Sequence, residues 1–383
     1  MKEILNKEVL NYLENNKEQT LKLIEELCKI PAPSGKEERR AEFVKNYMES
    51  FGAKGVYIDD ALNVIYPVNC DGKKNITVFM AHTDTVFPDT TYPMPFKRDE
   101  TTLYSPGVGD DTACLAIMLI VAKYVTEKGL KAANGVLFVA NSCEEGLGNL
   151  KGCKQLMKDF DGRVDSVYTL DGGYKHVVNK CVGSHRYRIT FETEGGHSFN
   201  NFGNRNAIFA MSSLINELYK CQVPVNGDSK TTYNVGVVEG GTSVNTIAQR
   251  AVMLYEYRSD DEDCLAKMQN YFETCVANLK KDGKAEVNVE LIGVRPCSGK
   301  VDENKLNEMT KKVIEICQKH SGVLCKAESG STDANIPMSL GIPAVCVGVY
   351  NGTGVHTREE TVEIASIPIG LKIAAELILS HFN

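Results

Sequence analysis

Histidines and acidic residues follow several apolar segments of this sequence, and these are residue types that bind divalent metal ions. The segment NITVFMAHTD ends in His82 and Asp84, which are two residues apart and therefore project to the same side of an extended chain. Three later apolar segments are followed by the same kinds of residue: Glu144 and Glu145, then Asp171, then His356. A carboxylate that merely fixes a histidine at a strand end explains one such pair, but the repetition favours a shared site.

The combined set of side chains suits two divalent cations. Asp110 and Asp111, in the segment GVGDDTA, add two further acids. Two imidazoles and several carboxylates without a nearby thiolate favour zinc, cobalt or manganese. Two such ions that share a bridging group lower the pKa of water and polarise a carbonyl oxygen, which is the chemistry of amide hydrolysis.

Each acidic pair also has a simpler interpretation. Asp110 and Asp111 suit the positive end of a helix, and Glu144 with Glu145 suits a solvated turn. If all these acids meet at one edge of a sheet, however, their mutual repulsion requires compensating positive charge. Metal ions would supply that charge.

The segments that carry these residues alternate with predicted helices. Strand-like apolar segments precede His82, Glu144 and Asp171, and a further one lies within 343–349, before His356. A long helix is predicted after Asp111. This alternation predicts an α/β fold with a mostly parallel sheet covered by helices, in which ligands bind beyond the carboxyl ends of the strands.

The pattern changes between residues 183 and 293, where half-exposed strands and two helices follow in the order β-α-β-β-α-β. That order is typical of a small ferredoxin-like α+β domain. Because strands that end in acids and histidines lie on both sides of it, we predict an insertion. The catalytic domain is then discontinuous, comprising residues 1–182 and 294–383, with the insert at 183–293 and candidate hinges at the two junctions.

Composition limits the classes of partner. The chain has 383 residues, of which 43% are hydrophobic and 24% charged, and a formal charge of -7 without a basic block, which argues against nucleic acid and anionic membranes. The first 19 residues predict an amphipathic helix rather than a signal peptide, and no segment approaches the roughly 20 apolar residues that span a bilayer. Thirteen cysteines without a C-x-x-C pair fit reduced thiols in the cytoplasm.

Six motifs of the chain resemble those of a known family: HTDT, GVGDDTA, CEEG, TLDGG, GGHS and VHTREE. Their order and spacing are similar to those of the dinuclear zinc metallopeptidases and deacylases that include peptidase T, carboxypeptidase G, acetylornithine deacetylase and succinyl-diaminopimelate desuccinylase. The peptidase T-like branch is the most similar. The resemblance implies a zinc-exopeptidase-like catalytic domain with an inserted dimerisation or lid domain. Thr112 and Ala113 stand where many relatives have lysine and glycine.

The resemblance also implies roles for individual residues. It implies two zinc ions per chain, for which cobalt or manganese can substitute, with Asp110 as the bridging ligand. The remaining implied ligands are His82 and Asp171 for one ion, and Glu145 and His356 for the other. Glu144 would be the general base, and Asp84 would hold the His82 ring in its ligating tautomer.

Three residues of the insert match further positions of the family. His197 would reach the site of a partner subunit in a homodimer and stabilise the oxyanion, while Asn245 and Arg258 would contact the substrate. On residue type alone, His197 also fits a surface histidine on a glycine-rich turn, and Arg258 a structural ion pair.

The predicted function is hydrolysis of amide bonds in short peptides by a tripeptidase-like aminopeptidase. The alternative is an N-acyl amino acid deacylase of the acetylornithine deacetylase or desuccinylase type. A binding protein that has lost catalysis is disfavoured, because Glu144 and all five implied ligands are present. The sequence leaves open the preferred side chains, carboxypeptidase activity and the metal used in the cell.

Overall fold

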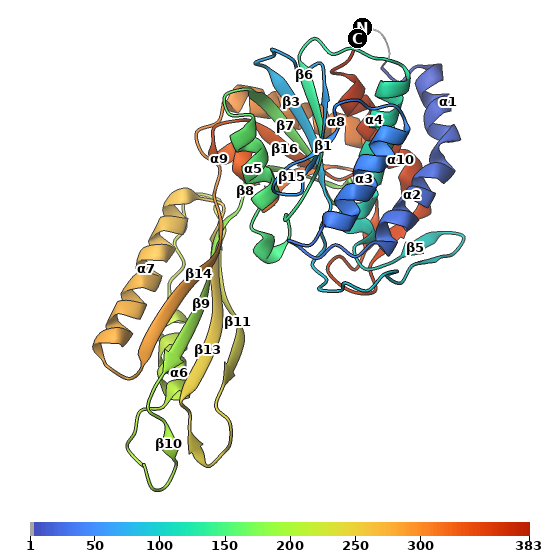
Figure 1. Ribbon diagram of the computed structural model, residues 1–383. Helices are drawn as coiled ribbons and strands as arrows, with labels where there is room; N and C mark the ends of the chain where they lie inside the picture. The colour runs from blue at the N-terminus through green and yellow to red at the C-terminus, as the bar shows by residue number, and fades with distance from the viewer. Residues whose placement is uncertain (1–3) are drawn as a thin grey trace. The chain divides into compact units, whose positions relative to one another are not determined.

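The computed structural model describes residues 4–383, which form two compact units (Figure 1). Unit 1 comprises the described part of Met1–Lys180 together with Gly299–Asn383, and unit 2 comprises Cys181–Ser298. The insert predicted at 183–293 lies within unit 2. The first three residues of the predicted N-terminal amphipathic helix lie outside the described residues.

The centre of unit 1 is an eight-stranded sheet. Its strands are, in spatial order, β1 (Tyr57–Ile58), β2 (Val64–Val68), β6 (Gly135–Asn141), β3 (Ile76–His82), β7 (Val164–Leu170), β16 (Ala344–Val347), β8 (His176–Cys181) and β15 (Lys326–Gly330). The four central strands β6, β3, β7 and β16 are parallel, whereas β2 and β8 pair antiparallel with their outer members. The predicted α/β fold with a mostly parallel sheet is confirmed for this core.

The central strand β3 explains why the sheet needs helices on both faces. All seven of its residues are buried, and its neighbours on both sides are parallel strands. Phe79 and Ala81 belong to the main hydrophobic core with the helices α4 and α10, whereas the alternate residues Val78 and Met80 face the other side. Because both faces of the sheet are covered, a ligand can reach it at the ends of the strands.

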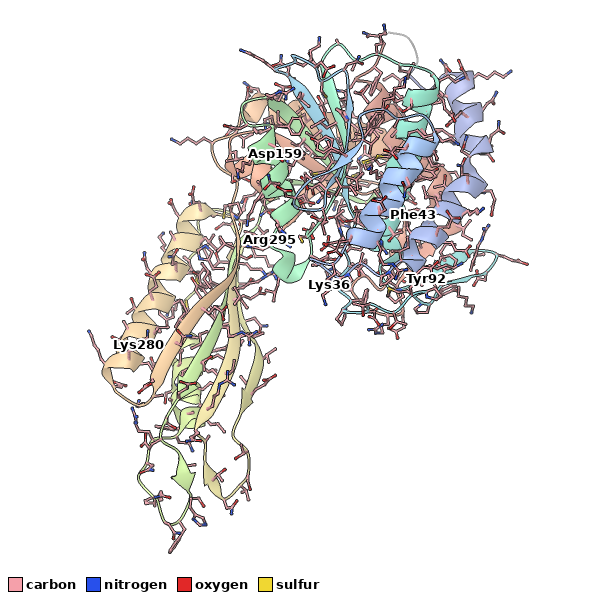
Figure 2. The ribbon with its side chains drawn as sticks, viewed as in Figure 1. Lys36, Phe43, Tyr92, Asp159, Lys280 and Arg295 are labelled. Carbon is pink, nitrogen blue, oxygen red and sulfur yellow. The ribbon has the colours of Figure 1, made fainter. Side chains whose placement is uncertain are left out.

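The helices of unit 1 are α1 (Lys7–Asn15), α2 (Lys17–Lys29), α3 (Glu38–Ser50), α4 (Cys114–Glu127), α5 (Lys151–Asp159), α8 (Glu303–Ser321), α9 (Asn335–Ser339) and α10 (Ile367–Leu379). A small second sheet contains β17 (Gly352–Thr353), β18 (Thr361–Glu363), β5 (Thr102–Tyr104) and β4 (Lys97–Arg98). In Figure 2, Phe43 marks α3, where it packs against the main core. Within residues 4–383, no helix combines the length and apolarity needed to cross a membrane.

Unit 2 is an antiparallel four-stranded sheet with two helices. The strands are, in spatial order, β11 (Thr231–Gly240), β13 (Arg250–Ser259), β9 (Gly183–Glu192) and β14 (Glu286–Arg295), and the helices are α6 (Ala207–Leu218) and α7 (Glu262–Lys281). Alternate residues of β9, such as Ile189 and Phe191, join both helices in a separate core. The chain order is β-α-β-β-α-β, as predicted for the ferredoxin-like α+β part.

Candidate metal centre

Five segments of unit 1 bring the predicted metal-binding residues to one edge of the central sheet. His82 is the last residue of β3, and Glu144 and Glu145 follow β6. Asp171 follows β7 directly, and Asp110 lies in the irregular turn before α4. Because β3, β6 and β7 are parallel neighbours, the residues that follow them meet at the same edge. His356 joins them from the loop between β17 and β18.

The Asp110 carboxylate lies between the two histidines. Its Oδ1 is 2.9 Å from His82 Nε2, and its Oδ2 is 3.0 Å from His356 Nε2. His356 Nε2 is also 3.1 Å from Glu145 Oε1. One carboxylate that presents each oxygen to a different histidine has the form of a bridging ligand.

The potential ligand atoms fall into overlapping groups whose members all lie within 4.8 Å of one another. The groups are His82, Asp110 and Asp171; Asp110, Glu145 and His356; and His82, Glu144 and Glu145. The first two share Asp110 and contain the two ligand sets that the family resemblance implies. All five implied ligands are therefore together in the structure.

The electrostatics of the cluster fit a cation. Hydrogen bonds with Asp110 and Glu145 raise the pKa of His356 to about 10. Burial raises the pKa of Asp171, and the neighbouring charge of Asp110 raises it further. Both pKa shifts reflect the excess of negative charge in the cluster, which a bound divalent ion would compensate. The donor set and its excess of carboxylates match the requirements of hard-to-borderline metals.

Asp84 holds the cluster through both its main chain and its carboxylate. The Nδ1 atom of His82 is 3.0 Å from the main-chain oxygen of Asp84 and 3.4 Å from its Oδ1. The Asp84 carboxylate accepts hydrogen bonds from the main-chain N–H groups of Glu144 and Glu145, at 2.9 and 3.0 Å, and from Ser34 Oγ at 2.5 Å. Asp84 thus orients the His82 ring and also fixes the segment that carries two other candidate residues.

Glu144 is buried beside the candidate ligands, with 5% of its surface exposed. Its carboxylate lies with donor atoms of His82 and Glu145 in one of the groups described above. A carboxylate in this position is next to ligands and within reach of a water molecule that approaches them.

Two buried acids beside the site were not assigned a role from the sequence. Asp111 Oδ2 accepts a hydrogen bond from the main-chain N–H of His82 at 3.0 Å. Glu360 accepts three main-chain hydrogen bonds of 2.8 to 3.0 Å from Gly107, Gly109 and Asp110. Burial raises the pKa of Glu360 to about 7. Asp111 belongs to the DD pair next to Asp110, and Glu360 belongs to the motif VHTREE with His356. Their closeness in sequence to predicted ligands is the signal that could have identified them.

Arg40 is a third supporting residue, and it is almost completely buried at 1% exposure. Its guanidinium donates to the main-chain oxygens of Thr83, Leu27 and Ile30 at 2.7 to 2.8 Å. Thr83 lies between His82 and Asp84, so Arg40 anchors the strand end that carries them. In the sequence, Arg40 precedes Val44 by four residues and shares its buried helix face, but this spacing alone does not distinguish it from a surface arginine.

The candidate residues of unit 2 separate into two places. His197 and Asn245 lie together at the short ladder between β10 (Gly196–His197) and β12 (Thr246–Ile247), where the main-chain N–H of Ser198 donates to the main-chain oxygen of Asn245. Arg258 lies at the opposite end of β13 from Arg250, and its guanidinium donates twice to Glu256, at 2.9 and 3.0 Å. Arg258 therefore has the geometry of a structural ion pair.

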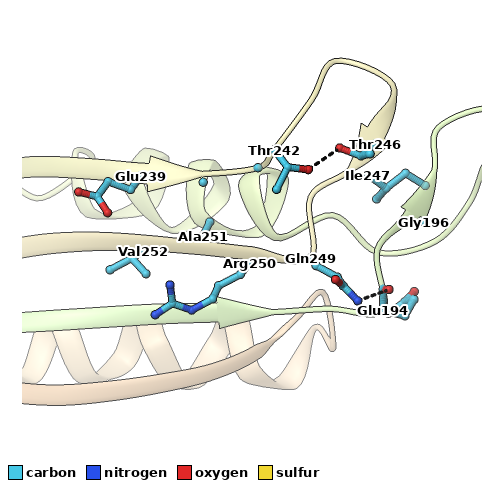
Figure 3. A pocket seen from close by; sticks show the side chains of 12 residues that line it. Glu194, Gly196, Glu239, Thr242, Thr246, Ile247, Gln249, Arg250, Ala251 and Val252 are labelled. Atoms are coloured by element: carbon cyan, nitrogen blue, oxygen red, sulfur yellow. Dashed lines mark hydrogen bonds between the residues drawn. The ribbon is translucent and has the colours of Figure 1, made fainter.

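The His197 ring is oriented by its own turn. Its Nδ1 accepts hydrogen bonds from the main-chain N–H groups of Phe199 and Asn200 at 3.2 and 3.4 Å. In the neutral ring the proton is then on Nε2, which makes Nε2 a hydrogen-bond donor. A pocket of about 660 Å³ lies beside this ladder, and Figure 3 shows Gly196, Thr246 and Arg250 among the residues that line it.

Comparisons with known proteins identify the family of the chain. The family model described as peptidase family M20/M25/M40 matches residues 78–380. The chain is 24% identical over 357 residues to succinyl-diaminopimelate desuccinylase of Corynebacterium glutamicum, covering 90% of this chain and 92% of the relative.

Two solved structures have a similar fold. A tripeptidase from Staphylococcus aureus has a TM-score of 0.72 and 24% identity, and the match covers 95% of this chain and 98% of that one. A dinuclear metal-binding peptidase from Bacillus subtilis has a TM-score of 0.64 and 15% identity, with 96% and 98% coverage. Since the family model matches well over half of the sequence, the chain belongs to peptidase family M20/M25/M40, and it is a hydrolase that acts on peptide or amide bonds.

Proposed function

We propose that this protein is a two-zinc exopeptidase, specifically a tripeptidase-like aminopeptidase that acts on short peptides. The observation that carries the proposal is the Asp110 carboxylate, whose two oxygens are 2.9 and 3.0 Å from His82 and His356. Two overlapping ligand groups that share this residue support two ions rather than one. The fold similarity to the staphylococcal tripeptidase supports the choice of peptides.

In the proposed site, Asp110 would be shared by the two ions, with His82 and Asp171 holding one ion and Glu145 and His356 holding the other. When bound, the two ions lower the pKa of water and polarise the substrate carbonyl. Zinc is the proposed metal because imidazole and carboxylate donors suit it, and cobalt or manganese can use the same donors.

Glu144 is the proposed general base. It takes a proton from the attacking water and passes it to the departing amine. Its burial beside His82 and Glu145 limits competition from bulk water. Asp84 keeps His82 in its ligating tautomer and keeps Glu144 in place through the hydrogen bond to its main-chain N–H.

We propose that the protein is a homodimer in which His197 and Asn245 of one subunit act on the substrate of the other. His197 Nε2 is a hydrogen-bond donor suited to an oxyanion, and it is carried on an exposed turn. The surface of unit 2 is unusually apolar near this turn, where Phe199 and Phe202 are 84% and 91% exposed. The strand β11 is also an unpaired edge of its sheet, which suits pairing with a second chain. Arg258 stays a weaker substrate-binding candidate, because Glu256 already binds it.

Mixed dimers test this arrangement. Glu144→Gln and His197→Ala proteins are each expected to be nearly inactive. When the two are co-expressed with distinct tags, a heterodimer contains one site with intact Glu144 and an intact His197 from the partner, so the mixture regains about a quarter of wild-type activity. No recovery in a purified heterodimer would show that His197 does not act across the dimer.

The substrate proposal is tested with purified protein loaded with defined metals. We expect about two tightly bound ions per chain and faster cleavage of tripeptides than of N-acetyl or N-succinyl amino acids. Fewer than about one ion per chain in the presence of excess zinc would contradict the two-metal site.

The second candidate function is an N-acyl amino acid deacylase. The similarity over 90% of the chain to a succinyl-diaminopimelate desuccinylase favours it as the alternative. Faster release of succinate or acetate than of an N-terminal amino acid in the same panel would select this function. In either case we propose a cytoplasmic location, since thirteen cysteines without a disulfide among the described residues suit a reducing compartment.

A further inference from the structure

A pocket of unit 1 opens beside the candidate metal centre. Its volume is about 460 Å³, and it is lined by three loops of the same sheet edge, within residues 33–35, 85–88 and 143–148, together with Lys151. Glu145 belongs both to this lining and to the metal-binding cluster. A substrate group next to the cleaved bond can therefore enter this pocket, whose volume lies in the range of ligand sites.

The walls of this pocket are largely apolar. Phe87 is buried, whereas Val86 and Leu147 are 39% and 60% exposed and supply open apolar surface. Phe87 is held from outside the lining, because the Arg358 guanidinium lies 5.4 Å from its ring centroid and also pairs with Asp89 at 2.7 Å. The pocket therefore has one fixed apolar wall and two exposed apolar side chains that can adjust to a ligand.

The two charged side chains of the lining differ in whether they are free to bind a ligand. Glu145 is its only acidic side chain, and it faces His356 and the metal-binding cluster. Lys151 is its only cationic side chain, and among the described residues it has no hydrogen-bond or ion-pair partner. Lys151 is also the first residue of α5, where the helix dipole adds positive potential. Once Glu145 binds a cation, Lys151 is the charge that a ligand in the pocket meets.

We propose that this pocket selects substrates with an acidic side chain on a residue next to the cleaved bond. The methylene groups of the side chain lie against Val86 and Leu147, and the carboxylate pairs with Lys151 Nζ. Lys151 is then a specificity-determining residue. The inference rests on the proposed function in that the ligand is a peptide cleaved at the metal centre.

Three sets of tripeptides test the proposal, in which glutamate, glutamine or lysine occupies one of the three positions in turn. At one position, wild-type protein should cleave the glutamate peptide with a kcat/KM about tenfold higher than the glutamine peptide. This ratio should fall towards one in Lys151→Gln and favour lysine over glutamate in Lys151→Glu. Added salt should reduce the wild-type ratio, because Lys151 is exposed.

Lys158→Gln is the matched control. It removes the same charge from an exposed position of the same helix, outside the pocket lining, and should keep the wild-type ratio. The glutamine peptide reports on general damage in Lys158→Gln, where its kcat/KM should equal that of wild type. A glutamate preference that is absent from wild type, or that survives in Lys151→Gln, overturns the inference even when peptides are cleaved.

Binding of the same peptides to metal-loaded Glu144→Gln protein, measured by calorimetry, separates this inference from the proposed function. Tighter binding of glutamate than glutamine peptides that depends on Lys151 supports the pocket even if wild-type protein cleaves no peptide. Equal binding of the two peptides overturns it. Failure of the proposed function alone is seen as absent cleavage of every peptide.

Discussion

The two halves of the candidate metal centre use similar ligands, but their histidines lie in very different surroundings. The inner half, His82 and Asp171, has a histidine with 2% of its surface exposed, whereas the outer half, Glu145 and His356, has a histidine side chain that is 54% exposed. Asp110 belongs to both. Desolvated and firmly oriented ligands lose less entropy and compete less with water when they bind an ion. We therefore expect the inner ion to bind more tightly and the outer ion to exchange.

The supports of the two halves differ in the same way. The inner half is supported by the fully enclosed guanidinium of Arg40 through Thr83. The loop of His356 is supported by the ion pair between Arg358 and Asp89, whose side chains are 53% and 34% exposed. The buried support is therefore at the strand ends, whereas the support of the His356 loop is open to solvent.

The largest expected effect separates chemistry from metal binding. In Glu144→Gln, kcat should fall by about a thousandfold, because the side chain can no longer accept a proton. Metal content, measured by mass spectrometry of dialysed protein, should stay near the wild-type value in both halves. Glu145→Gln is the neighbouring control and should lose the outer ion. Activity of Glu144→Gln within tenfold of wild type would remove Glu144 from its role.

Removal of each histidine tests the comparison directly. His356→Ala should retain about one ion per chain after dialysis, since the inner ligands are intact. His82→Ala should retain less, because it removes a buried ligand and leaves the acids near it uncompensated. Metal per chain is measured after dialysis against graded chelator. If His82→Ala kept more metal than His356→Ala, the order of the two halves would be reversed.

Replacement of Arg40 tests the buried support. Arg40→Met leaves three main-chain oxygens without their donor, which should lower the free energy of unfolding by about 4 kcal/mol. Urea denaturation of the metal-free proteins measures this change. Arg39→Met is the control on the next residue, where an exposed guanidinium lies 4.7 Å from the Tyr92 ring centroid, and it should cost less than about 1 kcal/mol. Equal costs for the two variants would show that burial of Arg40 is not what matters.

Acid conditions should lower the stability of the folded chain as well as its affinity for metal, and His381 allows the two effects to be separated. His381 contacts the rings of Phe79 and Tyr168, and burial lowers its pKa from 6.5 to about 4. Below pH 6.5 the unfolded chain takes up a proton that the folded chain does not, so this residue should remove about 3 kcal/mol of stability as the pH falls from 6.5 to 4. His381→Phe should lose less stability over that range.

Thermal unfolding of metal-free protein at pH 7 and pH 4.5 measures this difference between wild type and His381→Phe. Because the protein is metal-free, a smaller loss of stability in the variant reflects the folded chain itself and not metal binding. The same acid sensitivity in both proteins would assign the loss to other groups.

The smallest expected effect concerns the outer support. Arg358→Gln breaks an exposed ion pair and should change the free energy of unfolding by less than about 1 kcal/mol. The outer ion should nevertheless dissociate a few times faster, because the loop of His356 loses its link to Asp89. Stopped-flow chelation with wild type as reference measures the rate. A loss of stability comparable to that of Arg40→Met would contradict the proposed difference between the supports.

The sequence predicts those parts of the site that are local to strand ends. His82, Glu145 and Asp171 lie at or just beyond the ends of recognisable buried strands, so the parallel sheet alone brings them together. The order β-α-β-β-α-β of unit 2 could be predicted for the same reason, since each element has its own periodicity.

The remaining features depend on tertiary contacts that no local pattern encodes. Arg40 looks like one more charge on an amphipathic helix until its three main-chain acceptors are known. For Arg258, residue type fits both a family role and a structural ion pair, and only the structure identifies Glu256 as the partner. The Asp84 carboxylate was expected to orient a ring, yet most of its hydrogen bonds fix the Glu144–Glu145 main chain.

The junctions of the insert have a consequence for how this molecule can be altered. Cys181 N–H donates to Ser298 Oγ at 3.1 Å, so the incoming and outgoing strands of unit 2 are tied to each other where they enter it. A module whose two ends adjoin can be exchanged for another, or bypassed by a short peptide, without stretching the host scaffold. All five candidate ligands would remain in such a minimised scaffold, which makes the chain a natural recipient for transplanted specificity domains.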